Sequence, residues 1–101
     1  MLLKIKVNAL CDGEEISGEQ TIEVVAGEFE LNEIFKSSFY RVRIDCVIDD
    51  NVCFCILTGA IVAKYFVLKP CERGEYSRGE SARTGFGGAV LDYTDFLFEV
   101  M

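Results

Sequence analysis

One apolar stretch limits what this chain can fold into. Residues 52–63 carry no charge, and after Lys64 the apolar residues continue as far as Leu68. Most of these side chains are β-branched or aromatic, which is typical of buried strands. Gly59 interrupts the stretch near its middle, so it predicts two neighbouring strands. A helix that crosses a bilayer needs ~20 predominantly apolar residues, and this stretch is too short and too interrupted for that.

The length and composition of the chain indicate one domain. Of its 101 residues, 50% are hydrophobic and 27% are charged, which is enough apolar material for a core without disulfides or metals. The first residues include Lys4 and Lys6 and have no unbroken apolar run, so we predict neither a signal peptide nor a membrane span. We therefore expect a single domain over residues 1–101 that is cytoplasmic and does not bind a membrane.

Alternation of apolar and polar residues predicts further strands on both sides of the apolar stretch. The alternating segments are residues 3–11, 19–25, 41–48 and 89–100. Together with the apolar stretch they predict an all-β, mostly antiparallel fold of about six strands, either a small sandwich or a flattened barrel. Residues 71–88 lack this pattern, and we expect them to form one long irregular loop.

Only one segment has the residue spacing of a helix. Leu31, Ile34 and Phe35 are spaced to share one helical face, and Lys36 follows where the helix dipole favours a positive charge. The pattern lasts about two turns, which is too short for a helix that is stable alone. We expect one short helix near residues 32–36 that covers an end of the β core.

The polar residues 49–51, Asp-Asp-Asn, separate two of the predicted strands. A three-residue hairpin loop at residues 49–51 would place Cys46 opposite Phe54, whereas a two-residue turn at Asp50 and Asn51 would bring Cys46 opposite Cys55. The first register buries more apolar volume, so we expect the three-residue loop. In that register Cys46 points away from Cys53 and Cys55.

The five cysteines are expected to stay reduced, because their number is odd and the chain is expected in the cytoplasm. Cys53 and Cys55 share one face of a predicted strand and could contribute to a metal site. A structural zinc site needs four ligands, however, and the chain contains no histidine. We expect both cysteines to pack as core residues, and we predict neither a metal nor a cofactor.

The absence of histidine also removes the commonest general base. The aspartates and glutamates are explained by turns, strand edges and solvated faces, and no base or nucleophile motif accompanies them. We therefore expect the protein not to be an enzyme, and we assign no catalytic residues.

The acidity of the chain has two explanations, simple solubility or a basic protein partner. Its formal net charge of -7 argues against direct binding to a nucleic-acid backbone, which depends on lysine and arginine. Residues 12–33 are especially rich in acids. We expect a non-catalytic interaction module whose acidic surface engages a basic protein, which includes small inhibitors or antagonists that imitate the charge of nucleic acids.

The segment 60–68 is apolar on both faces apart from Lys64. A strand with one face in water does not have this composition. At this chain length we expect the second face to be covered by another subunit, so the sequence predicts a homo-oligomer.

The predicted loop contains a pentad in which Arg73, Arg78 and Arg83 recur at a spacing of five. Arginine offers a two-pronged fork to phosphate or carboxylate, and glycine-rich backbone can approach an anion closely. Neighbouring glutamates balance the three positive charges. The alternative is therefore that arginine and glutamate side chains form ion pairs with each other inside the loop and bind no ligand. The candidate ligand-binding residues are Arg73, Tyr76, Arg78, Arg83, Thr84 and Phe86, with the two aromatic rings available to stack on a base. The alternative function is therefore an oligomer that binds a small anion or nucleotide through residues 73–88.

Overall fold

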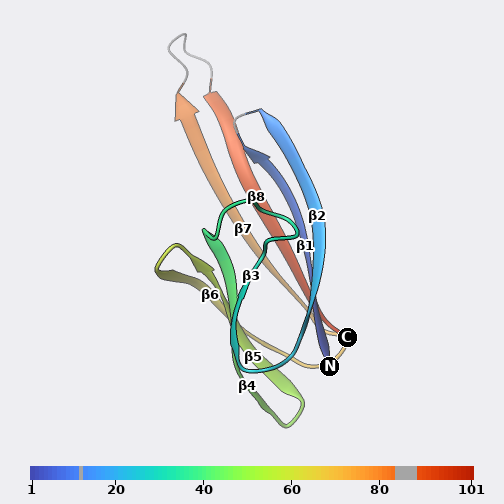
Figure 1. The fold of residues 1–101 in the computed structure, drawn as a ribbon. Coiled ribbons are helices and arrows are strands. Elements are labelled where there is room, and N and C mark those ends of the chain that lie inside the picture. The colour runs from blue at the N-terminus through green and yellow to red at the C-terminus, as the bar shows by residue number, and fades with distance from the viewer. Residues whose placement is uncertain (12, 84–88) are drawn as a thin grey trace.

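The computed structural model describes residues 1–11, 13–83 and 89–101, and for residues 80–83 and 89–91 it describes the backbone alone. Within these ranges the chain forms eight strands (Figure 1). They are β1 (Leu2–Cys11), β2 (Glu14–Glu23), β3 (Gly27–Glu30), β4 (Tyr40–Ile48), β5 (Asn51–Thr58), β6 (Ile61–Leu68), β7 (Arg73–Arg83) and β8 (Ala89–Val100). This described part of the chain contains no helix that is long and apolar enough to cross a membrane.

The strands make two four-stranded sheets in which every pairing is antiparallel. The first sheet has the order β2-β1-β8-β7, and the second has the order β3-β4-β5-β6. The chain passes to the second sheet between β2 and β3 and returns between β6 and β7. The predicted all-β, antiparallel class is confirmed, with β3 and β7 in addition to the expected strands. The alternative of a flattened barrel is wrong for the described strands, because the two sheets do not close on each other.

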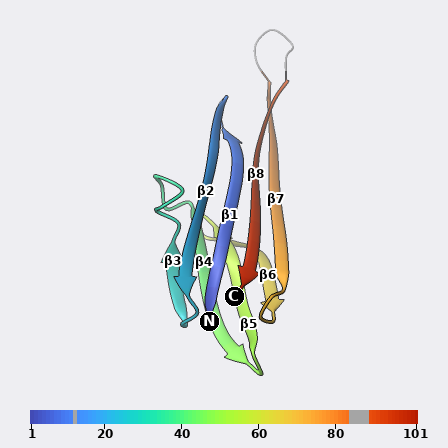
Figure 2. The same cartoon turned by 90° about the vertical axis from the view of Figure 1, so that its right-hand side faces the viewer.

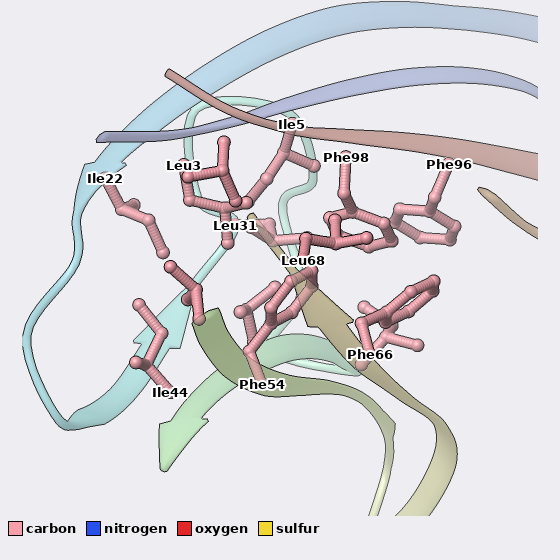
Figure 3. Packing of buried hydrophobic residues seen from close by; sticks show 14 of the residues in the cluster. Leu3, Ile5, Ile22, Leu31, Ile44, Phe54, Phe66, Leu68, Phe96 and Phe98 are labelled. Carbon is pink, nitrogen blue, oxygen red and sulfur yellow. The ribbon is translucent and has the colours of Figure 1, made fainter. Parts of the chain in front are cut away.

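Both sheets turn apolar faces toward one shared core (Figure 3). Alternation along β1 buries Leu3 and Ile5 in it, as the sequence pattern predicts. Phe98 of β8 meets Phe54 of β5 and Phe66 of β6 with ring centroids 5.3 and 4.9 Å apart. Burying one such ring contributes about 1.5–3 kcal/mol relative to leaving it exposed. These aromatic contacts hold the two sheets together.

The first sheet is the longer of the two and extends beyond the second (Figures 1 and 2). Its strands β7 and β8, of 11 and 12 residues, carry it past the ends of β3 to β6. The molecule is therefore elongated, with principal extents of 54 × 23 × 22 Å.

The predicted short helix near residues 32–36 is not found, and residues 32–34 instead form a turn. The amide of Phe35 donates to the carbonyl of Leu31 at 2.8 Å, which closes a single helical turn that does not continue. The buried side chain of Gln20 fixes this turn, because its Oε1 accepts a hydrogen bond from the amide of Glu33 at 3.1 Å. The apolar spacing therefore indicated which side chains face the core, but one turn is below the length at which a helix propagates.

The hairpin between β4 and β5 differs from the predicted one. Asp49 and Asp50 form a two-residue turn with φ values of 50° and 65°. Two successive left-handed residues are what a type I′ hairpin turn requires. Cys46 consequently pairs with Cys53, and a bulge between Ile44 and Cys46 returns Ile44 to the core face. The predicted three-residue loop is wrong because the bulge, and not a longer loop, restores the apolar alternation.

β7 occupies most of the segment that was predicted to be a loop. Its residues pair with β8 from Arg73, opposite Glu99, to Arg83, opposite Ala89. The glycine at position 74 conceals the strand in the sequence, although it faces the core. A Cβ atom at Gly74 would lie 2.7 Å from Cδ1 of Phe66, so close packing between the sheets requires glycine there.

Candidate functional site

Two neighbouring open strands carry a concentration of negative charge. Residues 13–33 contain seven glutamates and no lysine or arginine. All seven are exposed, and β2 and β3, which bear most of them, lie on the same side of the molecule (Figure 2). We call this surface the acidic edge, and its members are Glu14, Glu15, Glu19, Glu23, Glu28, Glu30 and Glu33.

Gln20 connects the two strands of the acidic edge. Its side chain is 7% exposed and reaches from β2 to the end of β3, where Nε2 donates to the carbonyl of Glu30 at 2.9 Å. The same amide group accepts the hydrogen bond from Glu33 at 3.1 Å. A buried amide with both of its ends bonded fixes the geometry around it. The glutamates of β2 and of the turn after β3 are therefore held beside each other.

Two members of the acidic edge are neutralised locally. Glu19 forms an ion pair with Lys4 at 3.2 Å, and Glu28 forms one with Arg41. Exposed ion pairs of this kind contribute about 0–1 kcal/mol. The other five glutamates form no ion pair with a described side chain. The edge therefore keeps most of its charge for interactions outside the chain.

The backbone of the acidic edge also has binding capacity. In the sheets formed by the described residues, β2 pairs with β1 alone and β3 with β4 alone. The outer N–H and C=O groups of both strands thus have no neighbouring strand. Such an edge can accept an added strand from another chain, and charged side chains on it restrict which chain can pair. The acidic edge is consequently suited to an extended segment that carries positive charge.

The structure separates the arginines that the sequence grouped into one candidate ligand site. Because five is an odd number of residues, consecutive pentad positions in an extended strand point to opposite faces, about 16 Å apart. Arg73 lies on the outer face of the first sheet, where its Nε donates to Oε2 of Glu99 at 2.7 Å. Arg78 lies on the inner face, with its guanidinium 5.2 Å from the centre of the Phe39 ring. One small anion cannot contact both.

The other predicted ligand-binding residues have different positions. Tyr76 packs against the core, with its ring centroid 5.9 Å from that of Phe96. Arg83 is the last residue of β7, where only the backbone is described. Thr84 and Phe86 lie outside the described residues. Two of the predicted residues line cavities. Arg73 borders a small one of about 140 Å³ that it shares with Lys4, Lys6 and Glu99, and Arg78 borders a larger one.

That cavity lies where the second sheet ends and the first sheet continues. It has a volume of about 240 Å³. Its walls include Phe39, which precedes β4, and Tyr40, the first residue of β4, together with Arg78, Asp92 and Thr94 from the first sheet. The hydroxyl of Tyr40 donates to Oγ1 of Thr94 at 3.4 Å, beneath the cavity opening. Sequence reasoning missed all of these except Arg78, because their proximity depends on how the two sheets are stacked. Its volume is below the ~300 Å³ of ordinary ligand pockets, and an acid shares it with the arginine.

The outer face of β6 is apolar and open to solvent. Tyr65 and Val67 are 63% and 62% exposed, whereas Phe66 and Leu68 on the opposite face are buried in the core. Ile61 is 70% exposed as well, but a bulge in the pairing with β5 separates it from this face. Both faces of this strand are therefore apolar in the structure, as its composition predicts. One face builds the core, and the other has no cover from the described residues.

Among the described side chains, no group of three or more cysteines and acids is arranged to hold a metal ion. Comparison with known proteins adds no further constraint, since no family model, curated protein or solved structure matches the chain.

Proposed function

We propose that the chain is a β-sandwich interaction module without catalytic activity, and that its acidic edge binds a basic segment of a partner protein. The observation that carries this proposal is the run of seven glutamates, uninterrupted by lysine or arginine, on and beside two open strands. The strands supply a backbone to which an extended chain can hydrogen-bond, and the carboxylates select for positive charge.

The charge on the other side of the molecule supports the same proposal. Residues 61–83, which include β6 and β7, contain five lysines and arginines and three glutamates. In Figure 2 these two strands lie opposite the acidic edge. A basic partner is therefore attracted toward one side of the molecule and not the other. Such steering raises the association rate and weakens as salt concentration increases.

The spacing of the glutamates fits recognition of an extended segment. Glu15, Glu19 and Glu23 pair in register with Leu10, Lys6 and Leu2 of β1, so they share the outer face of the sheet. Successive members are about 13 Å apart along the strand. A basic segment added beside β2 would present side chains at matching intervals. If that segment also binds nucleic acid, its occupation would make this chain an antagonist of nucleic-acid binding.

A binding experiment with a defined probe tests the proposal. The probe is a short fluorescent oligolysine peptide, and binding is followed by anisotropy over a range of salt concentrations. The test variant is Glu23→Gln/Glu30→Gln, and the matched control is Glu75→Gln/Asp95→Asn, which removes the same charge elsewhere. We expect the test variant to bind about tenfold more weakly, a loss of about 1.4 kcal/mol, and the control to bind like the wild type.

Equal weakening in both double variants would contradict the proposal, since binding would then follow net charge alone. Absence of binding by the wild-type chain at low salt would also contradict it. In that case the glutamates serve to protect open strands from pairing with other chains, which is a common use of charge at sheet edges.

The cavity beside Arg78 supports a second candidate, the binding of a small anion or nucleotide. The guanidinium over the Phe39 ring places a positive charge and an aromatic face in one opening. Calorimetric titration with a nucleoside monophosphate tests this candidate with Arg78→Gln. Arg73→Gln is the matched control, because Arg73 lies on the opposite face of the same strand. Equal affinity in the two variants would exclude Arg78 from the binding of the nucleotide.

A further inference from the structure

The outer face of the second sheet carries three cysteines whose surroundings differ. Cys53 lies on the central strand β5, where its neighbours across the sheet are Cys46 on β4 and Val67 on β6. Cys55 is two residues further along the same strand. Cys46 and Cys53 are half-buried, whereas Cys55 is buried completely. The three thiols therefore share one face but not the same access to solvent.

A polar bridge accounts for the burial of Cys55. Its cross-strand neighbours are Arg43 on β4 and Tyr65 on β6. Nη2 of Arg43 donates to the hydroxyl of Tyr65 at 3.5 Å, so the two long side chains meet across β5 above the thiol. Nε of Arg43 is held at 2.9 Å from Oδ1 of Asp45. Cys53, one row closer to the hairpin turn, lies outside this bridge.

We propose that Cys46 and Cys53 form a dithiol site that a small-molecule disulfide of the glutathione type oxidises to a cross-strand disulfide. The two residues are direct partners in an antiparallel pair, for which Cα atoms are about 4.5–5.5 Å apart. Disulfides occupy Cα separations of about 4.4–6.8 Å. Both side chains point to the same face, and the thiols are close enough for Cys46 to hydrogen-bond with Cys53.

No other pair among the five cysteines has this geometry. Cys53 and Cys55 are two residues apart on one strand, which separates their Cβ atoms by about 6.6 Å, whereas a disulfide needs about 3.8 Å. Cys11 ends β1 in the other sheet, and Cys71 lies in the connection between β6 and β7. The site is therefore one specific pair, created by the two-residue turn at Asp49 and Asp50.

The reaction proceeds by two successive thiol–disulfide exchanges. One cysteine loses its proton, and its thiolate attacks one sulfur of the small disulfide, so that the S–S bond breaks and one small thiolate leaves. The second cysteine then loses its proton and attacks the protein sulfur of the mixed disulfide, which releases the second small thiol. Two protein thiols are oxidised, and one small disulfide is reduced to two thiols.

The surroundings of Cys53 control the rate of this exchange. Burial raises the pKa of the Cys53 thiol, and it is raised further by the hydrogen bond with Cys46, which favours the protonated thiol, and by negative charge at Cys46 and Asp45. On β6 the thiol faces the apolar side chain of Val67. Because the thiolate is the reactive form, we expect closure to accelerate as the pH increases through the alkaline range.

The test uses the full wild-type chain in glutathione redox buffers. After equilibration the reaction is quenched with acid, free thiols are alkylated, and peptides are mapped by mass spectrometry. We expect a Cys46–Cys53 cross-link that forms at about tenfold less oxidised glutathione than a mixed disulfide at Cys71, because the second exchange is intramolecular. Cys55 should be alkylated after the protein is unfolded and not before.

Two variants serve as controls. Cys46→Ser should stop at a mixed disulfide on Cys53, whereas Cys71→Ser should close like the wild type. Circular dichroism verifies that both variants are folded. The cross-links mapped in the wild-type chain test the proposal even if a variant does not fold. The proposal is overturned if the wild type accumulates only mixed disulfides or if Cys46→Ser forms a Cys53–Cys55 cross-link.

Discussion

At the scale of single residues, two glycines of β7 show how closely the sheets approach each other. A Cβ atom at Gly74 would lie 2.7 and 2.8 Å from two atoms of the Phe66 ring, whereas nothing lies within 4 Å of a Cβ atom at Gly79. The ring cannot move aside easily, because it packs between Phe54 and Phe98. The two glycines therefore have different roles on one strand.

We expect Gly74→Ala to destabilise the protein by about 1–3 kcal/mol, the usual cost of overpacking a core. Gly79→Ala is the control, and it should be neutral or stabilise by up to about 1 kcal/mol, since glycine is unfavourable inside a strand. The measurement is urea denaturation of both variants beside the wild type. Equal stabilities of the two variants would show that the sheets are not in close contact at Gly74.

The buried thiol of Cys55 makes stability depend on pH. Burial raises its pKa above the ordinary value of 9.0, although the charge of Arg43 opposes the shift. The folded state therefore keeps the proton that the unfolded state loses. The resulting stabilisation is fully present below pH 9.0, the unfolded value, and is lost as the pH rises through the folded value.

Accordingly, Cys55→Ala should lose less stability than the wild type between neutral pH and the alkaline range above 9.0. Cys71→Ala, at an exposed cysteine, should follow the wild-type curve. Denaturation at a series of pH values, with all samples fully reduced, provides the comparison. A Cys55→Ala curve parallel to that of the wild type would exclude this thiol as the source.

At the scale of elements, the period-two pattern was sufficient for strands with one apolar face. It predicted the strands now seen as β1, β4 and β8 and the second half of β2, which begins at Glu14 and not at residue 19, and the apolar stretch predicted β5 and β6. β7 was missed because Gly74 and Arg78 occupy inward positions where an apolar residue is expected. β3 was missed because four residues are too few to show a period. The register of β4 and β5 was missed because a bulge in the strand gives the same alternation as a longer loop.

The turn between β4 and β5 can be tested directly. Asp50 has φ of 65°, which costs an ordinary residue about 1–2 kcal/mol and glycine almost nothing. We therefore expect Asp50→Gly to raise the melting temperature. Asn51→Gly should lower it, since Nδ2 of Asn51 donates to the carbonyl of Ile48 at 3.0 Å. If Asn51→Gly raised the melting temperature and Asp50→Gly lowered it, the result would support the three-residue loop.

At the scale of the whole molecule, the chemistry of the acidic edge was predictable and its geometry was not. The acid-rich segment is visible in the sequence, and it predicted an acidic interaction surface as a hypothesis. The approach of β2 to β3 depends on the crossover between sheets and on the contacts of Gln20. The relative positions of Arg73 and Arg78 were not predictable for the same reason, because a spacing of five residues brings side chains together in a loop but separates them in an extended strand.

The exposed face of β6 bears on the predicted homo-oligomer, which we retain as a proposal. If a second copy covers this face, Val67→Lys should weaken association strongly, because it places a charge in an apolar contact. Leu2→Lys is a suitable control, since Leu2 is 40% exposed on the other sheet. Sedimentation equilibrium of the three proteins distinguishes the cases. If the wild-type chain remained monomeric at high concentration, the proposal of a homo-oligomer would be excluded.

The unequal lengths of the two sheets divide the molecule into a doubly covered part and a part that is a single layer. Opening free energies in proteins increase with the apolar contact around each hydrogen bond. Amide protons on β8 near Phe98 should therefore exchange with solvent deuterium far more slowly than the amide of Gly79 on β7, although both residues belong to the same paired ribbon. Unfolding would then begin as fraying at the overhang and travel along one hairpin toward the aromatic centre.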